Sequence, residues 1–214
     1  MTRIALIHAT PLAMPPIAEA FQRLWPDADI FNLLEDSLST DLAQLGRLDD
    51  AMTDRFRRLA RYAADCGADS ILFTCSAFGP CIEAAAEDLE PMPVLKPNEA
   101  MFAETLAIGG RIGLVATFTP SLPAMTAEFN DMAADMGADA NLISVCANGA
   151  LDALSDGDAT RHDNLIAEAA ESLSNCNAIM LAQFSMANGS KAVESRVFCP
   201  VLTSPDSAVR RLKG

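Results

Sequence analysis

Cys75 is the residue whose type and position best suit it to chemistry. It follows the short apolar run 71–73 and precedes a segment in which apolar residues recur at helical spacing. A thiol at the start of a helix is expected to have a lowered pKa, because backbone N–H dipoles stabilise the thiolate. Such a thiolate can take a proton from carbon or return one. The alternative is an inert buried cysteine, which is how we interpret the other five: Cys66, Cys81, Cys146, Cys176 and Cys199.

Polar side chains follow each of the predicted central strands. His8 and Thr10 come after the first strand, and Thr74 and Ser76 flank Cys75. Ligands of open parallel sheets bind at the carboxyl ends of strands, where helix N-termini favour anions. We therefore predict that these loops bind a small carboxylate and that His8 is a candidate base, although the hydroxyls could merely cap helices. Residues in the same kind of position in the second half are Thr117, Thr119, Ser121, Gln183 and Ser185.

The two halves of the chain are similar in sequence. Residues 3–7 read Arg-Ile-Ala-Leu-Ile and residues 111–115 read Arg-Ile-Gly-Leu-Val, so that Ile4 and Ile112 are 108 positions apart. The same offset of 108 places Gln183 over Cys75. The repeat predicts two similar lobes with a small ligand in the cleft between them. Cys75 and Gln183 would then face each other across that cleft.

Strand and helix signals alternate along the chain, which predicts an α/β fold in which each lobe has a mostly parallel sheet flanked by helices. The predicted strands are 4–7, 30–34, 70–73, 93–95, 112–116, 142–145, 179–181 and 201–202. One helix, with Leu48, Met52 and Phe56 on its apolar face, is expected between the second and third strands. We place the first lobe at 1–98 plus 204–214 and the second at 99–203.

The composition of the chain excludes several classes of partner and of binding site. The chain has 15 Lys and Arg against 29 Asp and Glu, a net charge of −14, which argues against nucleic acid and anionic membranes as partners. No apolar run approaches the roughly 18 residues of a membrane span. Residues 1–9 lack the order of a signal peptide, so we expect a cytoplasmic protein without disulfides. No Cys-x-x-Cys pair occurs and neither His has a zinc-type spacing to a Cys, so no metal site is predicted.

Three segments resemble the aspartate/glutamate/hydantoin racemase superfamily. They are Phe73-Thr74-Cys75-Ser76-Ala77-Phe78-Gly79, Gly110-Arg111-Ile112-Gly113-Leu114-Val115-Ala116-Thr117 and Leu181-Ala182-Gln183-Phe184-Ser185-Met186-Ala187. The resemblance implies a cofactor-independent isomerase that acts at the carbon beside a carboxylate or carbonyl, often as paired subunits. In such racemases two cysteines face opposite sides of that carbon. The first corresponds to Cys75. Positions that hold the substrate carboxylate correspond to Thr74, Ser76, Thr117 and Thr119.

The second catalytic cysteine of the superfamily corresponds to Gln183, which cannot act as a thiolate. This difference leaves three hypotheses for the mechanism. His8 or Ser185 could replace the second thiol, so that the chain remains a racemase. A single proton transfer could suffice, as in arylmalonate decarboxylases. Cys75 could be a nucleophile, as in maleate isomerases. We predict a racemase or isomerase acting on a small, amino-acid-like carboxylate, with a decarboxylase or a non-catalytic carboxylate sensor as alternatives.

Overall fold

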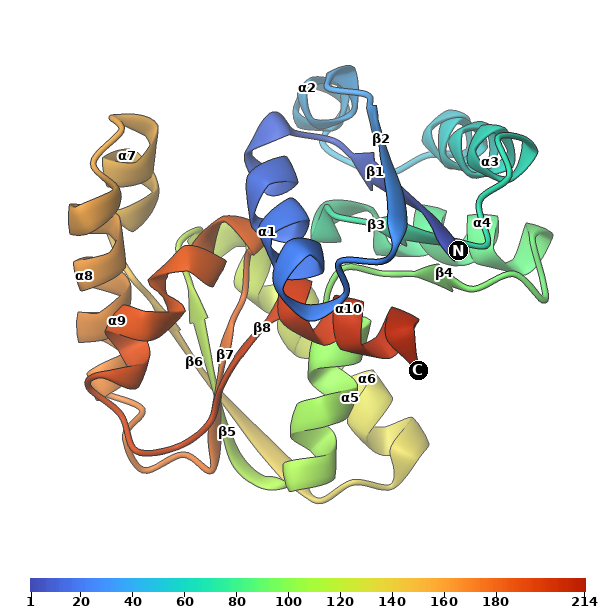
Figure 1. Cartoon of the computed structure of the whole chain (residues 1–214). Coiled ribbons are helices and arrows are strands. Elements are labelled where there is room, and N and C mark those ends of the chain that lie inside the picture. The colour runs from blue at the N-terminus through green and yellow to red at the C-terminus, as the bar shows by residue number, and fades with distance from the viewer. The chain divides into compact units, whose positions relative to one another are not determined.

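The computed structural model describes residues 1–214, which divide into two compact units (Figure 1). The first unit comprises Met1–Glu99 and Ala208–Gly214, and the second comprises Ala100–Ser207. Each unit contains one four-stranded sheet. None of the helices has the length and apolar character needed to cross a membrane.

The first unit is built on a parallel sheet with the strand order β2-β1-β3-β4. Its central strand β1 is completely buried from Ile4 onward, as an apolar run in a parallel sheet covered by helices should be. The strands are β1 (Arg3–His8), β2 (Asp29–Leu34), β3 (Ser70–Phe73) and β4 (Val94–Leu95). The helices are η1 (Pro11–Ala13), α1 (Met14–Leu24), α2 (Ser37–Leu45), α3 (Asp50–Asp65), η2 (Ser76–Phe78) and α4 (Gly79–Asp88).

A cluster of aromatic rings fixes α3 against the first sheet. The ring of Phe56 stacks on that of Phe73 with 5.2 Å between centroids and lies 4.9 Å from that of Phe78. All three side chains are buried. Helix α3 begins at Asp50 because the carboxylate of Asp49 accepts a hydrogen bond from the Met52 N–H at 2.8 Å. The cap and the rings together hold α3 against the sheet, where Phe56 lines the same hollow as Cys75.

The second unit repeats this design with the strand order β6-β5-β7-β8, again all parallel. Its core is a separate apolar cluster in which the rings of Phe102 and Phe129 meet edge to face at 5.5 Å. The strands are β5 (Gly110–Ala116), β6 (Ala140–Cys146), β7 (Ala178–Leu181) and β8 (Val201–Thr203). The helices are α5 (Glu99–Ile108), η3 (Thr119–Ser121), α6 (Leu122–Met136), α7 (Ala150–Ser155), α8 (Ala159–Glu171), η4 (Phe184–Gly189) and α9 (Ser190–Glu194). The last helix, α10 (Ser204–Lys213), begins in the second unit and belongs to the first unit from Ala208 onward.

The strand register confirms the predicted α/β fold and the internal repeat. Ile4 pairs with Ser70 in the first sheet, and Ile112 pairs with Ala178 in the second, so equivalent residues are paired. Two helices were not predicted. The sequence predicted one helix between β2 and β3, where the structure has both α2 and α3, and α7 precedes α8.

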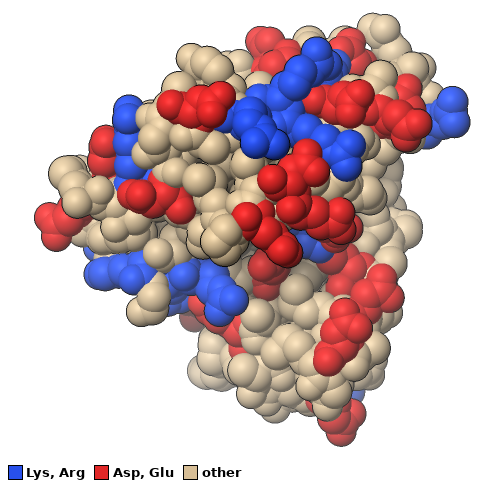
Figure 2. Space-filling model, turned by 90° about the vertical axis from the view of Figure 1, so that its right-hand side faces the viewer, with Lys and Arg blue, Asp and Glu red and all other residues tan.

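Charged side chains of both signs lie on the surface. Figure 2 shows Asp and Glu interspersed with Lys and Arg on the face that it presents. Several charged side chains of the protein are paired, as in Arg57 with Asp88 at 3.4 Å and Arg196 with Glu171 at 3.1 Å. Exposed pairs of this kind contribute little to stability.

Candidate active site

Cys75 lies at the carboxyl end of β3, as the sequence predicted. It is the residue before η2, with extended backbone at φ −122° and ψ 118°. The preceding residue Thr74 extends the pairing of β3 with β1, because its N–H donates to the carbonyl of Ile7 at 3.0 Å. The chain then turns sharply, and the backbone N–H of Ala77 donates to the Cys75 sulfur. The thiol is half-buried and forms no disulfide.

The expectation of a lowered thiol pKa was wrong for this structure. Burial raises the pKa of the Cys75 thiol, and the hydrogen bond from Ala77, which lowers it, is the smaller effect. The sulfur lies beside a small hollow lined mostly by apolar side chains, among them Leu38, Phe56 and Phe73, together with His8. Low polarity disfavours the charged thiolate. The free protein therefore holds Cys75 as a neutral thiol at pH 7.

Alkylation of Cys75 should report this raised pKa. Iodoacetamide reacts with the thiolate, so the rate at Cys75 should stay low near pH 7 and rise only above the ordinary thiol range. The measurement is peptide mass spectrometry of the folded protein over a pH series. The same cysteine in urea-unfolded protein is the matched control and should react faster at pH 7 with a lower midpoint. A folded-state midpoint at or below the unfolded one would contradict the burial argument.

His8 is buried at the end of β1, and both of its ring nitrogens form hydrogen bonds. Its Nδ1 lies 2.9 Å from the Thr74 hydroxyl oxygen, and its Nε2 lies 2.9 Å from Oδ1 of Asn32. Desolvation lowers the pKa of His8, and the Asn32 contact only partly opposes this. The imidazole is therefore neutral at pH 7, with the Nε2 proton donated to Asn32 and Nδ1 accepting from Thr74. Asn32 was missed in the sequence, where its only signal was one polar residue within the apolar segment 30–34.

The other predicted polar residues of the first unit, Thr10 and Ser76, differ in their contacts and in their distance along the chain from Cys75. The hydroxyl of Thr10 accepts the Leu12 N–H at 3.4 Å and so caps η1. Ser76 is half-buried in the first position of η2, next to the thiol. The structure thus brings His8 and Thr74 into contact beside Cys75. Thr10 instead caps the short helix η1.

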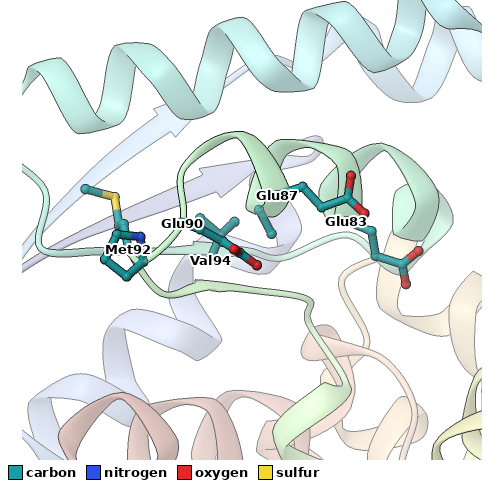
Figure 3. A pocket seen from close by; sticks show the side chains of 7 residues that line it. Glu83, Glu87, Glu90, Met92 and Val94 are labelled. Atoms are coloured by element: carbon teal, nitrogen blue, oxygen red, sulfur yellow. The ribbon is translucent and has the colours of Figure 1, made fainter.

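A shallow hollow of about 540 Å³ lies elsewhere on the first unit, over α4 and the chain leading into β4 (Figure 3). It is lined by Glu83, Glu87 and Glu90 with Met92 and Val94. The carboxylate of Glu83 is paired with the Lys96 ammonium at 2.7 Å. Three glutamates repel a carboxylate substrate, so this hollow is not the candidate active site.

Gln183 organises the polar groups of the second unit. It precedes η4 at the end of β7, the position equivalent to that of Cys75. Its Oε1 accepts from the Thr117 backbone N–H at 3.1 Å and from the Thr117 hydroxyl at 3.4 Å. Its Nε2 donates to the Ser121 hydroxyl oxygen at 3.2 Å, and that hydroxyl donates to the carbonyl of Phe118 at 2.7 Å. The amide is therefore held in one orientation.

The remaining candidates of the second unit differ in exposure. Thr119 is exposed at the start of η3, and Ser185 is half-buried within η4. His162 is buried, and its Nδ1 lies 2.8 Å from the Asp163 carboxylate. No group of three His, Cys, Asp or Glu side chains in residues 1–214 is arranged to hold a metal ion.

Two parallel sheets of equal topology, with a thiol and an amide at equivalent strand ends, define an α/β protein built from an internal repeat. The family model for Asp/Glu/Hydantoin racemase matches residues 7–212. The chain belongs to this family and is a racemase-type isomerase. No curated protein matches it in sequence.

Solved structures of related proteins share the fold. Allantoin racemase from Klebsiella pneumoniae is 17% identical with a TM-score of 0.72, covering 100% of this chain and 86% of that one. Aspartate racemase from Picrophilus torridus is 12% identical with a TM-score of 0.73, covering 100% and 94%. A glycine-to-cysteine mutant of arylmalonate decarboxylase is 21% identical with a TM-score of 0.66, covering 99% and 94%. At sequence identities this low, the similarity shows a shared fold and nothing more.

Proposed function

We propose that this chain transfers a proton at the α-carbon of a small, amino-acid-like carboxylate, with Cys75 as the acid and base. The observation that carries the proposal is the position of its sulfur at the carboxyl end of a central strand, with the Ala77 N–H directed at it. A raised pKa slows formation of the thiolate but makes it a stronger base once formed. A stronger base suits a weakly acidic α-proton.

The hydroxyl and N–H groups at the strand ends would stabilise the charge that develops on the substrate oxygens. We expect Ser76, Thr119 and Ser185, which lie at the start of short helical turns, to supply hydroxyls for this role. Preorganised hydrogen-bond donors stabilise such a transition state by several kcal/mol in a site that excludes water. His8 is neutral and holds the Thr74 hydroxyl, so we assign it to positioning rather than to proton transfer.

Gln183 is proposed to bind the substrate rather than to transfer a proton. Its Oε1 is engaged by Thr117, and one Nε2 proton is directed at Ser121. The second Nε2 proton is available to an oxygen of the substrate, since an amide nitrogen carries two. Ser185, two residues further along η4, is the candidate for the second proton donor.

A solvent-exchange measurement tests this function. Small α-substituted acids incubated with the protein in deuterium oxide should gain deuterium at the α-carbon, seen as loss of the α-proton signal in nuclear magnetic resonance. Chiral chromatography should then show both enantiomers appearing from one. Binding of the acids without any exchange would contradict the proposal and indicate a sensor.

Decarboxylation is the second candidate, and the neutral state of Cys75 favours it. A neutral thiol is ready to give a proton to an enediolate left by loss of carbon dioxide, and no second thiol is then needed. The test is release of carbon dioxide from substituted malonates, with one deuterium incorporated per product in deuterium oxide. Exchange of simple α-substituted acids without any malonate turnover would exclude this candidate.

A further inference from the structure

The loops at the carboxyl ends of the four central strands lack a cation. Residues 9–13, 74–78, 117–121 and 182–189, which follow β1, β3, β5 and β7, contain no Lys or Arg. Lys96, after β4, is paired with Glu83 at 2.7 Å. Arg55 of α3 is paired with Glu35 and Asp41. A substrate with a second carboxylate, such as aspartate or glutamate, would therefore find no cation in these loops to bind it.

The same loops present apolar side chains to solvent. Phe118, directly after Thr117, is 50% exposed, although aromatic rings are usually buried. Leu12 is 54% exposed in η1, the equivalent short helix of the first unit. Single exposed apolar residues are common on protein surfaces. Here, however, one occurs in each of two equivalent loops, beside the polar groups of the candidate site.

Hydrogen bonds hold Phe118 next to Gln183. The carbonyl of Phe118 accepts from the Ser121 hydroxyl at 2.7 Å and from the Ser121 N–H at 3.1 Å. That same hydroxyl oxygen accepts from Nε2 of Gln183 at 3.2 Å. The backbone of Phe118 is therefore fixed to the amide that we propose as a substrate-binding group. A substrate bound by Gln183 would therefore lie near the backbone of Phe118.

We propose that Phe118 determines substrate specificity, and that the α-carbon of the substrate carries an aryl or branched alkyl group rather than a second carboxylate. The inference rests on the proposed function. Burying an apolar substituent against the ring is favourable, whereas a carboxylate placed there would lose its hydration without gaining a cation.

Matched substrates test the inference. Phenylglycine is compared with aspartate, and 5-benzylhydantoin with hydantoin-5-acetic acid, by α-deuterium exchange corrected for the enzyme-free rate. The aryl member should be favoured by about 10-fold or more in kcat/KM, the range that an apolar pocket achieves. Equal or faster exchange of the carboxylate member in both pairs would overturn the inference while leaving the proposed function intact. No exchange in any probe, alanine and 5-methylhydantoin included, would remove the proposed function and this inference with it.

Variants of Phe118 distinguish a contact between its ring and the substrate from a general effect on the protein. Phe118→Ala should lower kcat/KM for the aryl substrate about 10-fold, mainly through KM, and leave alanine or 5-methylhydantoin within about twofold. Phe118→Arg should shift the preference toward aspartate. Phe198→Ala is the matched control, because Phe198 is fully exposed before β8, away from the carboxyl ends of the strands, and should change nothing. An equal loss for large and small substrates in Phe118→Ala would show a structural role and contradict the proposal.

Discussion

Replacing Cys75 with Ala should lower the rate of α-deuterium exchange by about 10²- to 10⁴-fold, the contribution of a general acid or base. The fold should survive, because the thiol is only half-buried and makes no disulfide. The measurement is the exchange rate of the best substrate of the screen. Circular dichroism and the denaturant midpoint should match those of the unaltered protein.

A matched substitution distinguishes loss of this thiol from loss of any thiol. Cys66→Ser changes a cysteine of similar exposure at the end of α3 and should exchange at the unaltered rate. Cys75→Ser keeps the size of the side chain but removes its acidity, so it should be almost as slow as Cys75→Ala. Undiminished exchange by Cys75→Ala would remove the thiol from the mechanism.

The repeat in the sequence was sufficient to predict the sheet topology. An offset of 108 places Ile4 over Ile112, and the structure pairs these two residues with equivalent partners, Ser70 and Ala178. Helix α2 could have been predicted, because Leu38, Leu42 and Leu45 recur at helical spacing. It is only nine residues long and buries only Leu38, so its signal is weaker than that of α3. The six residues of α7 are too few to show helical periodicity.

The position of Cys75 was predictable, but its protonation was not. The position follows from local sequence, since an apolar strand ends just before it. Its pKa depends on Leu38 and Phe56, which come from α2 and α3 and line the same hollow. A local rule about helix starts cannot include contacts made through the fold. The same holds for His8, whose partner Asn32 lies 24 residues away on the neighbouring strand.

Phe56→Ala should combine a large loss of stability with a faster reaction at Cys75. Phe56 is 1% exposed and packs against both Phe73 and Phe78. Truncating a buried Phe to Ala costs about 3–5 kcal/mol, a large part of the roughly 5–15 kcal/mol that stabilises a typical protein. The measurement is the free energy of unfolding from urea denaturation. The widened hollow should also admit water, move the pKa of Cys75 toward its ordinary value and speed its alkylation.

Two controls connect the faster alkylation to the hollow rather than to unfolding. Phe129→Ala removes a fully buried ring from the core of the second unit and should cost a similar free energy without accelerating the reaction at Cys75. Cys81 is fully buried in the first unit and should stay protected in Phe56→Ala, because only unfolding would expose it. Equal acceleration at Cys75 and Cys81 would mean that the unit opens as a whole. In that case the hollow would not be what sets the reactivity of the thiol.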